Sequence, residues 1–111
     1  MAGGLELERG EVRLCRFPPP DKERPVLVLT RGSAIGYLSR VTVAPITSTM
    51  RGVPSEVRLG VEEGMRGPCA VNLHNLVTID QKALGRCVAR LSATRMREVC
   101  GAIAFALGCD R

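Results

Sequence analysis

The sequence predicts a mainly β protein, in which a small, strongly curved antiparallel sheet or partly open barrel packs against one C-terminal helix. Two observations carry this prediction. Short apolar or alternating segments, separated by Pro- and Gly-containing turns, recur through the first 91 residues, and apolar residues with helical spacing follow only after them. With 111 residues and no repeat or linker, the chain is predicted to be a single domain, 1–111, with residues 1–8 as a flexible tail.

Six segments have the pattern of strands, namely 11–17, 25–30, 40–47, 55–59, 69–78 and 86–91. Three prolines make 18–24 a loop, and Pro45 predicts an edge or a bulge in the third strand. A turn with a short helical piece from Ser33 is expected near 31–36, and Asp80 is expected to cap a helical turn.

The terminal helix is predicted to begin after Ser92, a good N-cap residue, and to end at Gly108. Its expected apolar face comprises Met96, Val99, Ile103 and Leu107.

Positive charge is the first indication of function. Lys and Arg number 16 against 11 Asp and Glu, which gives a net charge of +5, and only Lys22 and Lys82 among these cations are lysines. A small basic domain attracts polyanions, nucleic acid above all, and arginine binds phosphate with a planar fork. A bias in genomic base composition would explain the arginine excess equally well. Three aromatic residues are too few for extensive base stacking.

The cysteines are predicted to be mostly buried apolar residues. They are odd in number and form no C-x-x-C motif, and the single histidine, His74, has no metal-ligand spacing to any of them, so neither zinc nor a disulfide framework is expected.

No apolar run approaches the roughly 18 residues of a membrane span. The charged first ten residues do not read as a secretory signal. A soluble, cytoplasmic protein is expected.

No phosphate-binding glycine loop, zinc-protease motif or serine-hydrolase motif occurs. The remaining candidates are polar residues near strand ends: Arg24, Thr47, Ser48, Thr49, Asn72, His74 and Asn75. Each also has an ordinary structural interpretation, as a solvated charge, a loop hydroxyl or the wet face of a half-exposed strand.

Five segments, taken in order, change this balance: Arg9-Gly-Glu-Val12, Arg24-Pro-Val-Leu-Val-Leu29, Val43-Ala-Pro-Ile-Thr-Ser48, Val71-Asn-Leu-His-Asn-Leu-Val-Thr-Ile-Asp80 and Leu84-Gly-Arg86. Together they resemble the MazF/PemK family of bacterial toxins from about residue 9 to residue 107. The resemblance implies an SH3-like curved sheet, a homodimer, and a sequence-specific endoribonuclease of a type II toxin–antitoxin pair. RNA would lie along the dimer groove, where the antitoxin's flexible C-terminal segment also binds.

The resemblance also implies chemistry without a metal or cofactor, in which the RNA 2′-hydroxyl attacks the adjacent phosphorus. Arg24 would stabilise the phosphorane, since a guanidinium stays protonated and is a poor base. Thr47 would hold a phosphate oxygen or orient the 2′-hydroxyl, and His74 is a third catalytic candidate because imidazole transfers protons near neutrality. The RNA-binding candidates are Ser48, Thr49, Arg51, Asn72, Asn75 and Lys22.

Two features depart from the family pattern. Arg13 stands where many relatives have an aromatic residue, and the loop 18–23 is short.

Two alternative functions stay open. One is a non-enzymatic, CcdB-like toxin that binds gyrase, which would need an anchor such as tryptophan that this chain lacks. The other is a catalytically inactive RNA-binding paralogue.

Overall fold

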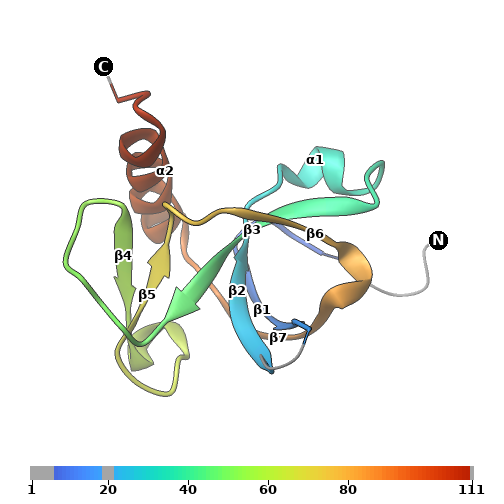
Figure 1. The fold of residues 1–111 in the computed structure, drawn as a ribbon, viewed down its shortest axis with the longest axis horizontal. Helices are drawn as coiled ribbons and strands as arrows, with labels where there is room; N and C mark the ends of the chain where they lie inside the picture. Colours follow the sequence, from blue (N-terminus) through green and yellow to red (C-terminus); the bar gives the residue numbers. More distant parts are fainter. Residues whose placement is uncertain (1–6, 19–21, 111) are drawn as a thin grey trace.

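A central strand, β3, connects the two parts of the molecule in the computed structural model, which describes residues 7–18 and 22–110 (Figure 1). The predicted mainly antiparallel, curved sheet with a C-terminal helix is confirmed. The strands are β1 (Glu11–Arg16), β2 (Glu23–Val28), β3 (Arg40–Thr47), β4 (Glu56–Leu59), β5 (Cys69–Asn72), β6 (Val77–Asp80) and β7 (Leu84–Arg90). The helices are α1 (Gly32–Ile35) and α2 (Ala93–Leu107), with single 3-10 turns η1 (Val61–Glu63) and η2 (Gln81–Ala83).

All pairings between the described strands are antiparallel, in the order β4-β5-β3-β2-β1-β7, with β6 also paired to β3. In Figure 1, β1, β2, β6 and β7 curve together on one side of the molecule, while β4, β5 and α2 lie on the other. Because β3 pairs with β2, β5 and β6, it belongs to both sides.

The expectation of one strand over 69–78 is wrong, because the segment divides into β5 and β6. Val43 pairs with Val77 and Ile46 pairs with Val71, so three steps along β3 correspond to six along its partner. The three extra residues are accommodated in the turn between β5 and β6, which comprises residues 73–76. Pro45 lies where β3 changes partner, which agrees with the predicted irregularity, since proline lacks the N–H that a regular ladder uses.

Two buried clusters, one on each face of the sheet, hold the molecule together. Alternation along β3 directs Val41 and Val43 into one cluster, and Ala44 and Ile46 into the other. The first fills the inside of the curve, and the second lies between the sheet and α2. The same strand therefore stabilises both halves of the fold.

The end signals of α2 are as predicted. The Ser92 side chain accepts a hydrogen bond from the Arg95 amide, and Gly108 ends the helix in the left-handed conformation at φ 74°. The predicted apolar face is correct for its first three members, which are buried or packed against the core. Leu107 is 62% exposed, because the last turn of α2 extends past the sheet.

Other predictions of local structure need correction. The strand β2 begins at Glu23, so Arg24 lies within it rather than in the preceding loop. Of the five free cysteines only Cys15 and Cys69 are buried, whereas Cys100 and Cys109 are exposed. Of the predicted tail, residues 1–6 lie outside the described residues, and Leu7 is buried. Within the described residues, no helix is long and apolar enough to cross a membrane.

Glu11 is the one charged side chain buried in the described part of the chain, at 1% exposure. Its carboxylate accepts hydrogen bonds from the Glu8 amide at 3.1 Å and from Arg13 Nε at 2.8 Å, and it pairs with Arg90 at 2.9 Å. Arg13 also donates to the Gly85 carbonyl at 2.9 Å. The residue that departs from the family pattern therefore ties β1 to β7.

Replacing Glu11 with glutamine should destabilise the fold by about 2–4 kcal/mol, because it leaves Arg13 and Arg90 without their shared counter-charge. Urea denaturation followed by circular dichroism measures this. Glu62→Gln, at an exposed position in η1, is the matched control and should change stability by less than about 0.5 kcal/mol. Equal stability of the two variants would contradict a structural role for Glu11.

Candidate active site

One face of the sheet carries polar side chains where β3, β4 and β5 meet. Thr47 pairs with Ala70, and Ala70 pairs with Arg58, so these three residues form one row across the strands. The neighbouring row contains Asn72 opposite Glu56. Residues opposite each other across a pleated sheet project from the same face, so all five side chains share it. The other face of these strands is apolar and packs toward α2.

The Thr47 hydroxyl is held by its own loop. Its Oγ1 accepts a hydrogen bond from the Thr49 amide at 3.0 Å. A hydroxyl has one donor and two acceptor positions, so this bond orients the oxygen and leaves the O–H able to donate. Ser48 and Thr49 follow as exposed residues. The end of β3 thus presents an oriented donor to solvent.

Arg24 lies on β2, two residues before Val26, which pairs with Pro45 on β3. Because side chains alternate, Arg24 shares a face with Val26, as Thr47 shares a face with Pro45. Arg24 and Thr47 are therefore on the same side of the sheet. Arg24 lies two residues before Val26 and Thr47 lies two residues after Pro45, so both are at the same end of the β2–β3 pairing. Figure 1 shows β2 and β3 separating beyond that pairing. Arg24 and Lys22 are both exposed.

Glu56 orders the loop between β3 and β4. Its Oε1 accepts hydrogen bonds from the amides of Arg51 at 3.0 Å and Gly52 at 2.9 Å. Gly52 has φ 73°, a conformation that favours glycine. Partial desolvation alone would raise the pKa of the Glu56 carboxyl, but hydrogen bonds from the amides of Gly52 and Arg51 outweigh it and lower the pKa.

His74 lies in the turn after β5, not within a strand as predicted. Its Nδ1 is 2.6 Å from the Oγ of Ser55, which is buried, and its backbone amide donates to Asn72 Oδ1 at 3.1 Å. The turn thus joins the end of β5 to the start of β4. Asn75, next in the turn, is exposed.

The structure places Arg24 and Thr47 on one side of the sheet, and it places His74 elsewhere. His74 lies four positions after Ala70, the partner of Thr47, which corresponds to at most about 13 Å at roughly 3.3 Å per residue. The turn at 73–76 shortens this distance but keeps His74 at the opposite end of β5. Arg24 and Thr47 therefore face the same side of the sheet, whereas His74 lies beside Ser55 in the turn after β5.

Sequence reasoning missed three residues of this region, namely Ser55, Glu56 and Arg58. Glu56 and Arg58 are two positions apart on one strand, a spacing that predicts a shared face. That signal was available, but which face they share depends on the pairing with β5. Nothing in the sequence indicates that buried Ser55 contacts His74.

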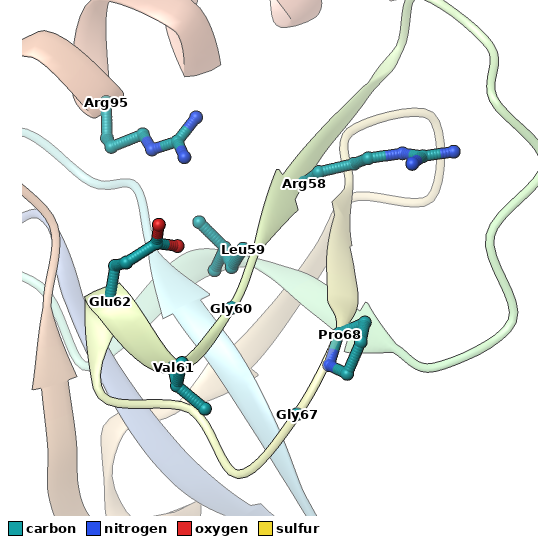
Figure 2. Close-up of a pocket in the computed structure, with 8 residues that line it drawn as sticks. All are labelled: Arg58, Leu59, Gly60, Val61, Glu62, Gly67, Pro68 and Arg95. Atoms are coloured by element: carbon teal, nitrogen blue, oxygen red, sulfur yellow. The ribbon is translucent and has the colours of Figure 1, made fainter.

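A shallow hollow of about 320 Å³ lies beside β4, between η1 and the start of α2 (Figure 2). Figure 2 shows that Glu62 and Arg95 lie on one side of β4, whereas the Arg58 side chain points the other way. Arg95 is paired with Glu63 at 3.1 Å and with Glu98 at 2.8 Å. Arg58 also lines the hollow, although its side chain points away from Glu62 and Arg95. Among the described residues, no group of three or more His, Cys, Asp or Glu could hold a metal ion.

The geometry suits a reaction in which negative charge develops at a phosphate. A guanidinium can stabilise that charge, and an oriented hydroxyl can donate to a phosphate oxygen. The ordered loop beyond Thr47 adds further backbone and hydroxyl groups for an extended ligand.

Comparisons with known proteins place this chain among toxins of one family. Residues 8–107 match the family described as PemK-like, MazF-like toxin of type II toxin–antitoxin system. The chain is 41% identical to endoribonuclease MazF3 of Mycobacterium tuberculosis over 81% of this chain and 87% of that protein. It is 37% identical to the solved structure of M. tuberculosis toxin MazF-mt6, with a TM-score of 0.83 over 91% of this chain and 99% of that one.

A more distant structure is an endoribonuclease in complex with its cognate antitoxin from a mycobacterial species. It is 25% identical and has a TM-score of 0.81 over 92% of this chain and 95% of that one.

Replacing Glu56 with glutamine should release the loop before β4. The pKa of Glu56 is lower in the folded protein than in the unfolded chain, so its stabilisation is complete above the unfolded pKa. It is lost as the pH falls through the folded pKa. At neutral pH, Glu56→Gln should shift the Arg51 and Gly52 amide resonances and make these amides exchange with solvent at least several-fold faster.

Glu63→Gln is the control, because Glu63 makes the same kind of bond to the Gly60 amide in a different loop. It should leave the Arg51 and Gly52 resonances in place. Unchanged resonances in Glu56→Gln would show that the carboxylate does not order the loop.

Proposed function

The chain belongs to the family of PemK-like, MazF-like toxins of type II toxin–antitoxin systems, and from this premise we propose that it is a sequence-specific endoribonuclease that cleaves single-stranded RNA without a metal ion. The relative MazF3 is named an endoribonuclease, and it shares 41% of its residues with this chain over the matched length. The observation that carries the proposal is the placement of Arg24 and Thr47 on one side of the sheet, beyond the Val26–Pro45 pair.

In the proposed reaction, the 2′-oxygen attacks the adjacent phosphorus and the bond from phosphorus to the 5′-oxygen breaks. The products are a 2′,3′-cyclic phosphate and a 5′-hydroxyl, so one proton leaves the 2′-hydroxyl and one reaches the 5′-oxygen. Arg24 stabilises the charge that grows on the phosphorane, and the Thr47 hydroxyl donates to a phosphate oxygen or orients the 2′-hydroxyl.

The remaining candidates have binding rather than chemical roles in this proposal. Ser48, Thr49 and Arg51 lie on the loop that Glu56 orders, next to Thr47 along the chain. Asn72, Asn75 and His74 lie at the far end of β5 and contact the RNA strand away from the bond that breaks. Lys22 contributes charge before β2.

The proposed working form is a homodimer whose RNA groove also receives the flexible C-terminal segment of a cognate antitoxin. Support comes from the family and from the related endoribonuclease that was solved with its antitoxin. Light scattering at micromolar concentration tests the dimer: a monomer mass with full nuclease activity would contradict it.

Cleavage should require the 2′-hydroxyl and should continue in EDTA, because Arg24 supplies the positive charge at the phosphate. An RNA with one 2′-deoxy nucleotide at the scissile position should bind and remain intact, since its nucleophile is missing. Gel analysis of product ends measures this. Cleavage of the 2′-deoxy substrate at the same bond, or loss of activity in EDTA, would refute the mechanism. Binding without any cleavage of ordinary RNA would indicate an inactive paralogue.

Replacing Arg24 with alanine should lower kcat about 10²–10³-fold, the usual loss when one donor to a developing anion is removed. Arg51→Ala is the comparison, because an arginine that binds RNA in the ground state affects mainly KM and its salt dependence. His74→Ala should lower kcat much less than Arg24→Ala and keep the shape of the pH–rate profile. A flattened profile for His74→Ala would return His74 to the chemical step.

A further inference from the structure

We propose that Arg58 on β4 is a phosphate-binding residue that extends the RNA path from the scissile phosphate across β5 to the edge of the sheet. This inference rests on the proposed endoribonuclease function and adds a subsite to it. The ligand is the backbone of single-stranded RNA, recognised through the phosphate oxygens and not through the bases.

The register of the sheet aligns Arg58 with Thr47. Thr47 pairs with Ala70, and Ala70 pairs with Arg58, so the two side chains rise from one row, two strand spacings apart. Adjacent strands are separated by roughly 4.8 Å, which places the two backbone positions about 10 Å apart. An extended RNA strand bridges that distance within a few nucleotides. Ala70, between them in the row, is fully buried, so its methyl group is covered and an RNA strand that runs from Thr47 to Arg58 passes above the groups that cover it.

The guanidinium of Arg58 has no carboxylate partner among the described residues. Glu56, two positions earlier on the same face, already accepts hydrogen bonds from the Arg51 and Gly52 amides. Glu62 lies on the other side of β4, as Figure 2 shows, and the Arg58 side chain extends away from it. An exposed, uncompensated arginine on the polar face is available to a phosphate.

The position of β4 at the end of the strand order supports this path. Beyond the β5–β4 pairing, no described strand covers the outer edge of β4, so a ligand that crosses the rows can continue past Arg58. The path runs across the strands, from Thr47 through Arg58, and the ordered loop of residues 48–53 lies at its start.

The test compares Arg58→Ala and Arg58→Lys with Arg66→Ala, which removes the same charge from an exposed position in the loop between η1 and β5. Arg58→Ala should raise KM about tenfold, leave kcat within about twofold, and reduce the slope of log affinity against log salt by about 0.7. Arg58→Lys should recover most of the salt slope but less of the affinity, because lysine lacks the fork. Arg66→Ala should resemble the wild type.

Shortened substrates locate the contact. The RNA is shortened stepwise on one side of the cleaved bond or on the other. The rise in KM caused by Arg58→Ala should disappear when the RNA is shortened on one of the two sides, and should persist when it is shortened on the other. Equal behaviour of Arg58→Ala and Arg66→Ala, or a penalty independent of substrate length, would overturn the proposal.

Fluorescence anisotropy with the RNA that carries one 2′-deoxy nucleotide separates the two hypotheses. If the wild type fails to cleave RNA, the proposed function fails. A weaker affinity of Arg58→Ala for the uncleaved strand, compared with Arg66→Ala, would still support the subsite. Equal affinities would remove it.

Discussion

The change of partner along β3 is the constraint on which the rest of the structure depends. From Arg40 to Val43 the strand pairs with β6, and at Ile46 and Thr47 it pairs with β5, with three extra residues inserted between the two partners. This offset turns the β4–β5 hairpin away from the curved sheet, so that Thr47 ends in a row with Ala70 and Arg58. It also moves His74 out of the strand and into a turn. The positions of the candidates on β3, β4 and β5 follow from that insertion, whereas Arg24 is placed by the pairing of β2 with β3.

The net charge of +5 is a poor measure of what the polar face offers to a polyanion. Arg13 and Arg90 share the buried Glu11, and Arg95 is held by Glu63 and Glu98. These arginines serve the fold, because their charges are already compensated. Recognition of RNA would depend on a few arginines whose positions are set by the register of the paired strands. Composition alone therefore indicates the class of ligand but does not locate its binding site.

The sequence predicts elements better than it predicts contacts. The bounds of β3, the Ser92 cap and the Gly108 stop follow from local chemistry, and they are confirmed. Arg24 and Thr47 stand out in the sequence only as polar residues near strand ends, and it is the family resemblance that implies their catalytic roles. The break at 73–76 was missed because apolar residues on both sides continue the alternation, and an Asn side chain that accepts from the backbone two residues later leaves no clear sign in a single sequence.

Glu56 and Arg58 show why part of the candidate site could not be predicted from the sequence: their location depends on the pairing of β4 with β5. Both alternate with Val57 and Leu59, so the pattern of β4 already divides the strand into an apolar and a charged face. A shift of one residue in the β4–β5 register would bury both charges, which is too costly to occur. The pattern therefore determines which face is polar, but only the pairing with Ala70 and Asn72 brings that face beside Thr47. One short strand then carries both the acid that orders the loop and the arginine that extends the path for RNA.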